Sequence, residues 1–217
     1  MVFSTLLETV GGQEFVNLDF EEANVPPIYL EGEGNQIDPA LAFPEWTVLP
    51  NSSAPLVYTT TFYNDVSLGG PAVTLIGPPF PNASGLNPLQ GSYSVLLQYF
   101  GIGGPPALSQ TGLIPADAES ITLLSDNLAG MIVTLNGINI PLVAIGGGSI
   151  GGNISAFAGD TAQLTISTVN SATEHSPAWV YFDDIQFSSS PVPEPGTLNL
   201  FTICILFLCW RIRRPHK

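Results

Sequence analysis

The side chains best suited to chemistry in this chain are carboxylates. Eighteen Asp and Glu residues accompany only four Lys and Arg and two His in 217 residues. Two adjacent acidic pairs, Glu21 with Glu22 and Asp183 with Asp184, could serve a glycosidase, whose mechanism uses two carboxyl groups flanking the scissile bond. The separation that such a mechanism needs is set by the fold. An acidic, solvated surface is therefore the interpretation that we favour for these pairs.

Hydrolytic chemistry of the Ser-His-Asp type would depend on His175. It is the only His in residues 1–210 and lies in the polar, turn-like segment NSATEHSP. A triad requires a base, a nucleophile and an orienting group that converge in space, and no such set can be identified around it. We interpret His175 as a solvated loop residue, assign no catalytic residue, and do not expect an enzyme.

Asp183 raises a different question, because its neighbours are large and apolar. In the segment WVYFDDIQF, alternate residues of a strand share one face. The set that includes this carboxylate is Tyr181, Asp183, Ile185 and Phe187. The other three are mainly apolar, which predicts a core face and a costly buried charge. Residues 1–210 contain no Lys or Arg to neutralise it, so either several hydrogen-bond donors or a bound cation must compensate.

A structural calcium ion is the cation that we consider. Ca²⁺ takes about 6–8 oxygen ligands and suits carboxylates from two chain ends together with backbone carbonyls. Asp19 and Glu21, beside the aromatic Phe20 of a predicted N-terminal strand, are the natural partners of Asp183. The alternative, that all of these residues are solvated acids, stays open.

The charge distribution excludes several function classes. The formal net charge is -14, and all four Lys and Arg lie in residues 211–217. Nucleic-acid binding is excluded, because it depends on Lys and Arg to displace phosphate counterions. The anionic body also repels anionic lipid headgroups, so membrane contact is expected only through the terminal segment. Cys204 and Cys209 both lie in that segment, so the body has no disulfide.

The C-terminal segment is predicted to be a single transmembrane helix that anchors the protein. Residues 200–210 are almost all apolar, and Arg211, Arg213 and Arg214 follow. A spanning helix needs about 17–25 apolar residues, so a helix over 198–210 is short and relies on snorkelling arginines at its boundary. A basic flank of this kind stays in the cytoplasm, which places the body outside. A buried helix or a tail packed on the body is the alternative.

A Pro-rich linker precedes this anchor. In SSSPVPEPG, three prolines exclude helix and sheet and leave an extended, exposed segment. Pro193, Glu194 and Pro195, followed by an apolar span and an Arg-rich end, resemble the PEP-CTERM sorting signal of Gram-negative bacteria over residues 191–214. The resemblance implies that an exosortase-type membrane peptidase recognises the motif and removes the anchor. The body then passes from the inner membrane to the cell surface or extracellular matrix.

The body is predicted to be all-β. Gly and Pro are frequent, and short β-branched or aromatic runs lie between them. The predicted strands are 15–20, 55–63, 72–76, 92–100, 120–124, 131–135, 138–143, 162–169 and 178–187. Asn136 and Gly137 can both take positive φ, which predicts a two-residue hairpin. Leu164 and Ile166 alternate with polar residues, as in a sheet with one wet face. The runs GIGGPP and AIGGGSIGGN are interpreted as turns.

The body also resembles a known class of modules. VNLDFEEAN near the start, GSYSVLLQ in the middle and WVYFDDIQFS at the end are similar to the first, central and last strands of jelly-roll carbohydrate-binding modules. The resemblance spans most of residues 15–188. It implies a jelly-roll β-sandwich with a calcium ion at the junction of its first and last strands.

These segments give a domain organisation in five parts. They are an uncertain N-terminal segment (1–14), the β-sandwich body (15–188), the linker (189–197), the anchor (198–210) and a basic cytoplasmic tail (211–217). The first part has neither the basic region nor the apolar stretch of an export signal. We therefore expect that the true start of the protein lies upstream, with a noncanonical export route as the less favoured alternative.

Two function classes remain. The first is a structural or adhesive component of the cell surface or extracellular matrix that binds polysaccharide, with Trp46 or Trp179 stacking on sugar rings. These aromatics could instead belong to the core. The second is a secreted hydrolase acting on matrix polysaccharide, which would need convergent carboxylates or a His constellation in a cleft. We favour the first.

Overall fold

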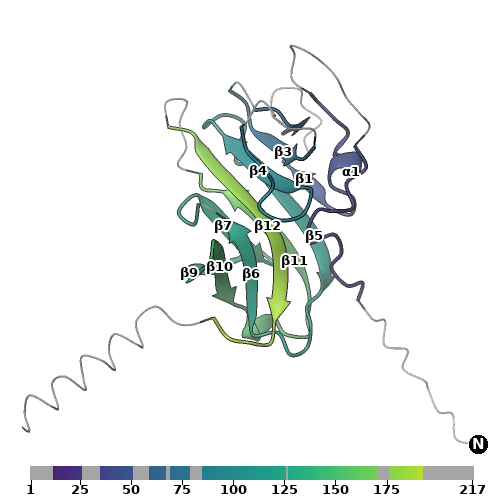
Figure 1. Cartoon of the computed structure of the whole chain (residues 1–217). Coiled ribbons are helices and arrows are strands. Elements are labelled where there is room, and N and C mark those ends of the chain that lie inside the picture. The colour runs from purple at the N-terminus through teal and green to yellow at the C-terminus, as the bar shows by residue number, and fades with distance from the viewer. Residues whose placement is uncertain are drawn as a thin grey trace, which may run out of the picture.

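Two packed β-sheets make up the part of the chain that the computed structural model describes, residues 12–25, 35–50, 59–66, 69–78, 85–125, 127–170 and 176–192 (Figure 1). The five-stranded sheet has the order β1 (Thr47–Leu49), β5 (Ala107–Leu113), β11 (Thr161–Thr168), β7 (Met131–Leu135), β8 (Ile138–Asn139). The seven-stranded sheet has the order β2 (Thr60–Tyr63), β3 (Ala72–Ile76), β4 (Ser94–Tyr99), β12 (Ala178–Ser188), β6 (Ser120–Ser125), β10 (Ser149–Asn153), β9 (Val143–Gly146). Helix α1 (Pro39–Ala42) and the 3-10 turn η1 (Ser155–Phe157) complete the elements.

The prediction of an all-β body is confirmed, although several strands differ from it. β3 and β7 have the predicted bounds, and β4, β6, β11 and β12 differ at their ends by one or two residues. The predicted strand 138–143 divides into β8 and the start of β9, and β2 covers only the end of 55–63. β1, β5 and β10 were not predicted. The run AIGGGSIGGN is not all turn, because it contains β10 and most of β9 around a turn at 147–148.

Residues 15–20 form a turn and not the predicted strand. Asn17 and Phe20 have φ values of 50° and 59°, which lie in the left-handed region and do not occur in a strand. The Asn17 side-chain amide donates to the carbonyl of Pro44 at 3.0 Å, and the Asn17 backbone carbonyl accepts from Nε1 of Trp46 at 2.9 Å. Contacts with a distant segment therefore determine this local conformation.

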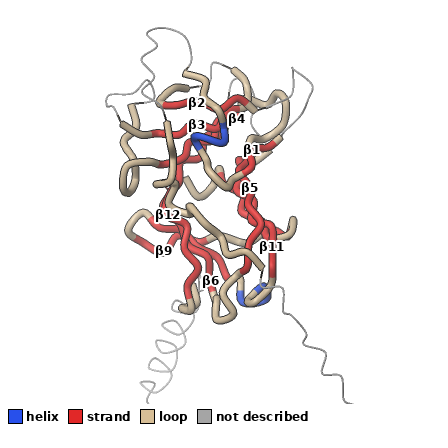
Figure 2. The backbone as a smooth tube through the Cα atoms, turned by 90° about the vertical axis from the view of Figure 1, so that its right-hand side faces the viewer, coloured by secondary structure: helices blue, strands red, loops and turns tan. Residues whose placement is uncertain are grey.

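The core lies between the two sheets. Leu108 and Ile166 from the five-stranded sheet and Val95 and Phe182 from the seven-stranded sheet are fully buried there. Phe20, also fully buried, makes an edge-to-face contact with Phe182 at a centroid distance of 5.7 Å. The predicted alternation in β11 is confirmed. Figure 2 shows β1, β5 and β11 on one side of the molecule and β6, β9 and β12 on the other.

Asn136 and Gly137 close the predicted hairpin between β7 and β8. Their φ values are 50° and 77°, as a tight turn with two left-handed residues requires, and Leu135 pairs with Ile138. The Asn136 side-chain oxygen accepts the amide of Gln163 at 2.9 Å, which ties the hairpin to β11.

β12 does not present one continuous face. Its register shifts after Asp183, and Asp184 has a φ of 47°. Ile185 therefore lies in the main core with Phe187 packed against it, whereas Tyr181 belongs to a small apolar cluster on the other face of the sheet. The predicted common face of Tyr181, Asp183, Ile185 and Phe187 is wrong, because a bulge adds a residue and reverses the alternation of side chains.

The described chain ends directly before the predicted sorting motif. Ser120 Oγ donates to the carbonyl of Ser190 at 2.7 Å, and Val192 lies against Gly151 of β10. The chain from Pro193 onward, including the predicted anchor, lies outside the described residues. Within the described ranges, no helix is long and apolar enough to cross a membrane.

Candidate functional site

Asp183 is buried in the seven-stranded sheet and is held by hydrogen-bond donors. The residue is 0% exposed. Its Oδ2 accepts Ser94 Oγ at 2.6 Å and the Gln90 amide at 3.0 Å, and its Oδ1 accepts the Asp184 amide at 2.7 Å. Burial raises the pKa of Asp183 to about 6, although these three donors oppose the rise. Hydrogen bonding, the first of the two predicted ways to compensate this charge, is therefore present.

Glu21 binds the same stretch of backbone. Its Oε1 accepts the amides of Ser92 and Tyr93 at 2.6 and 3.0 Å. Gly91 between them has a φ of 56°, and a Cβ at this position would overlap the Glu21 carboxylate. Segment 90–93 thus offers its amides to two carboxylates from opposite ends of the body.

The structure brings the three candidate calcium ligands together only in part. Asp19 Oδ1 accepts the Glu21 amide at 3.4 Å, and Glu21 shares segment 90–93 with Asp183. Among the described residues, no group of three or more His, Cys, Asp or Glu side chains could hold a metal ion. Oε2 of Glu21 accepts no hydrogen bond from any described residue. Calcium binding stays a prediction.

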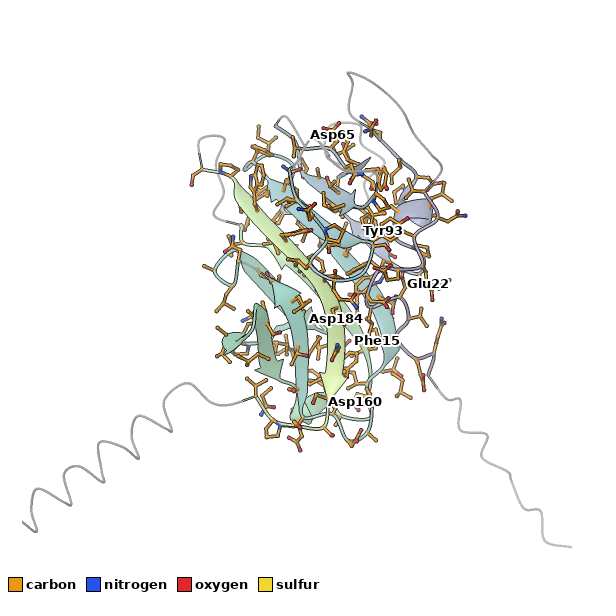
Figure 3. The ribbon with its side chains drawn as sticks, in the orientation of Figure 1. Phe15, Glu22, Asp65, Tyr93, Asp160 and Asp184 are labelled. Atoms are coloured by element: carbon orange, nitrogen blue, oxygen red, sulfur yellow. The ribbon has the colours of Figure 1, made fainter. Side chains whose placement is uncertain are left out.

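Glu22 and Asp184 are the remaining acidic candidates within the described part of the chain. Glu22 is exposed. Asp184 on β12 (Figure 3) accepts the Gln186 side-chain amide at 2.8 Å with both of its oxygens. His175 lies outside the described residues, as do the sorting motif and the three arginines of the tail.

The two aromatic candidates for sugar stacking differ in exposure. Trp46 is 6% exposed and donates its Nε1 to Asn17, so it belongs to the core. Trp179 is 40% exposed on β12, and its backbone carbonyl accepts the Asn127 side-chain amide at 2.7 Å. Of these two residues, only Trp179 is exposed enough to contact a sugar ring.

A cleft that the sequence did not reveal opens at the edge of the five-stranded sheet. β1 pairs with 107–109 of β5. Further along β5, Leu113 forms an isolated β-bridge with Glu14, so β1 and the segment around Glu14 lie one after the other along β5. The cleft at this junction has a volume of about 260 Å³. Its lining is polar: Gln13, Glu14, Glu45, Thr47, Ser109, Gln110, Thr111 and Gln163. Glu14 and Glu45 are isolated acids in the sequence, and only the sheet pairing joins them.

Short hydroxyl side chains cross the outer face of the same sheet. Ser109 pairs with Thr47 and Thr165, and Thr165 pairs with Thr134. Directly paired residues share a face, so these four side chains form one row across four strands, which we call the hydroxyl row. A second cleft of about 590 Å³ lies over the adjoining part of this face and is lined in part by Thr165 and Ser167.

Comparison with known proteins identifies one segment of the chain. Residues 191–214 match the PEP-CTERM protein-sorting motif. The match confirms the resemblance seen in the sequence and indicates an exported protein that is sorted by this signal, recognised by an exosortase-type membrane protein and delivered to the cell surface. No curated protein matches the chain.

Proposed function

We propose that the exported body is a non-catalytic, structural or adhesive component of the cell surface or extracellular matrix that binds polysaccharide. The hydroxyl row carries this proposal. This row offers hydrogen-bond donors and acceptors across four strands, from Thr47, Ser109, Thr165 and Thr134. The described residues include no Lys or Arg side chain. Sugar hydroxyls find complementary groups on such a face.

The two clefts on this face fit an extended ligand. One lies at the sheet edge and the other over the adjoining strand ends, and both are lined by residues of β1, β5 and β11. A polymer lying along β5 would reach from the first cleft, at 109–111, to the second, at 107, and would cross the hydroxyl row on the way. Such a ligand would pass over Thr165.

Binding to insoluble polysaccharide tests this function. The full chain in neutral detergent is mixed with a panel of insoluble polysaccharides, and the bound fraction is measured. Thr165→Tyr places a bulky ring in the middle of the hydroxyl row and is expected to weaken binding at least fivefold, since it blocks the ligand. Thr122→Tyr, on β6 of the other sheet, is the matched control. Equal loss in both variants, or binding to no member of the panel, contradicts the proposal.

A secreted polysaccharide hydrolase is the second candidate. The observation that favours it is that Glu14 and Glu45 line one cleft, because glycosidases use two carboxyl groups around the scissile bond. Release of reducing ends from a bound polysaccharide, lost in Glu14→Gln and in Glu45→Gln, would replace the non-catalytic role. Binding without release supports the first proposal.

A further inference from the structure

We infer that the 260 Å³ cleft is a subsite for a protonated amino sugar, which we call the amino-sugar subsite. This inference rests on the proposed polysaccharide binding and specifies the sugar class that this end of the face would recognise. Glu14 and Glu45, both exposed, line one opening, so two carboxylate side chains lie within reach of a ligand bound there. An ammonium group on a sugar ring donates three hydrogen bonds, and charge-assisted bonds to carboxylates are among the strongest that a polar site can make.

Gln110 holds both carboxylate-bearing segments in place. The residue is 7% exposed and lies in the gap between the two edge segments. Its side-chain amide donates to the carbonyls of Val16 at 3.0 Å and Glu45 at 3.2 Å, and its oxygen accepts the Val16 amide at 2.9 Å. One buried side chain therefore fixes the chain that carries Glu14 and the turn that carries Glu45.

Glu45 has an unusual backbone conformation. Its φ is 67°, in a region that residues other than Gly seldom adopt, and such outliers cluster at functional sites. The carbonyls on either side of its Cα are anchored: that of Pro44 by Asn17 and that of Glu45 itself by Gln110. The backbone conformation is held by buried polar groups, which fixes the point from which the Glu45 side chain extends before any ligand arrives.

Ser109 is the independent observation that points to a ligand. The residue is 3% exposed, and its place opposite Thr47 puts its hydroxyl on the face that lines the cleft. No described residue donates to or accepts from that hydroxyl. The hydroxyl itself is open to the cleft, so a ligand hydroxyl there can replace water as its hydrogen-bond partner.

The charge around the cleft and the volume of the cleft limit which sugars can bind there. All four Lys and Arg lie in residues 211–217, so no cationic side chain of the body can pair with an anionic ligand here. Uronic acids and sulfated sugars would meet two carboxylates and are excluded by like-charge repulsion. Drug-sized ligands occupy roughly 300–1,000 Å³, so the smaller cleft admits about one sugar ring.

Calorimetric titration of the full chain in neutral detergent at pH 6 tests the subsite. The probes are a β-1,4-linked glucosamine tetramer, its fully N-acetylated counterpart and a glucuronic acid oligomer. We expect the glucosamine tetramer to bind about tenfold or more tightly than the acetylated one, because acetylation removes the charge. No binding of the glucuronic acid oligomer is expected.

Charge-removing variants locate the site. Glu14→Gln and Glu45→Gln should each weaken glucosamine tetramer binding about tenfold and leave binding of the acetylated tetramer unchanged. Glu119→Gln, at an exposed residue outside the cleft, changes the net charge equally and should have no effect. Ser109→Ala should weaken both tetramers, since it removes a contact to a hydroxyl. Circular dichroism confirms that each variant is folded.

Three results would overturn the inference. Equal affinity for both tetramers would show that the ammonium group is not recognised. If Glu119→Gln weakens binding of the glucosamine tetramer as much as Glu14→Gln and Glu45→Gln do, the attraction comes from the whole anionic body and not from the cleft. In both cases binding of another polysaccharide leaves the proposed function standing. If all three Gln variants bind the glucosamine tetramer as tightly as the wild type, its amine binds outside this cleft. If no glycan binds at all, the inference and the proposed function fall together.

Discussion

Glu21 and Asp183, from opposite ends of the body, both accept hydrogen bonds from backbone amides of segment 90–93. The Gln90 amide reaches Asp183, and the Ser92 and Tyr93 amides reach Glu21. One short peptide segment thereby joins the N-terminal turn to the last strand.

Asp183 makes stability depend on pH. Burial raises its pKa to about 6 from the ordinary value of 3.8, so between these values the folded state holds a proton that the unfolded state has released. This group therefore lowers the unfolding free energy as pH rises from about 4 to about 6, by a total on the order of 3 kcal/mol. Urea unfolding of the full chain at pH 4.5 and pH 7 measures the change.

Asp183→Asn should remove this component and leave the slope caused by the other acids. Asp117→Asn, at an exposed site, is the control and should keep the wild-type slope. A difference in unfolding free energy between wild type and Asp183→Asn that is the same at both pH values would show that Asp183 does not titrate in this range.

Gly91→Ala should destabilise the protein by about 2 kcal/mol. A Cβ would collide with the Glu21 carboxylate and would also meet the left-handed backbone at φ 56°. Gly137→Ala, at φ 77° with open space around its Cβ position, suffers only the backbone strain and should cost about 1 kcal/mol. If combining Gly91→Ala with Glu21→Ala recovers none of the extra loss, the collision is not its cause.

Calcium is expected to raise the thermal midpoint. The described structure does not gather Asp19, Glu21 and Asp183 into a group that could hold a metal ion, so calcium would have to draw their side chains together, with backbone carbonyls completing its ligands. Because a ligand bound only by the folded state stabilises it, the full chain should melt higher in calcium than in chelator, and Asp183→Asn should abolish the difference. If the wild type melts at the same temperature in calcium and in chelator, calcium does not bind and hydrogen bonds alone compensate the buried Asp183 carboxylate.

Removal of the anchor is expected in a host that contains the cognate exosortase. The mature surface protein should lack residues after about Pro195, because the matched sorting motif starts at residue 191 and continues into the apolar span. A strain without the enzyme should retain the full C-terminus. Mass spectrometry that finds Arg213 and Lys217 in the surface-located protein would refute this processing.

Replacing Arg211, Arg213 and Arg214 with Gln should weaken retention of the tail in the cytoplasm, since cationic flanks set the orientation of a membrane anchor. Protease accessibility of a C-terminal tag, measured in a strain without the enzyme, reports the orientation. Equal protection in wild type and variant would show that the arginines do not determine it.

Local chemistry predicted part of this fold. The β7–β8 hairpin follows from Asn136 and Gly137, whose backbone preferences act within four residues. β5 was missed because its outer residues are short and polar, and its inner face includes Gln110, whose role depends on Val16 and Glu45. No pattern within β5 contains that information.

The candidate site depended still more on tertiary contacts. Burial of Asp183 was predicted, but for the wrong face, because a left-handed residue at Asp184 reverses the alternation. Asp tolerates this conformation better than most residues, and that is the only local signal of the bulge. The cleft with Glu14 and Glu45 exists because two remote segments pair with one strand, which spacing along the chain does not encode.

The position of β12 also matters for how an exported chain acquires its structure. The last strand lies in the interior of the seven-stranded sheet, between β4 and β6, so the sheet consists of two separate halves until residue 188 is available. Pairing β12 with β4 closes a long loop, which is slow. A chain emerging N-terminus first therefore stays incomplete through most of its passage, and folding finishes only when the segment just before the sorting motif arrives.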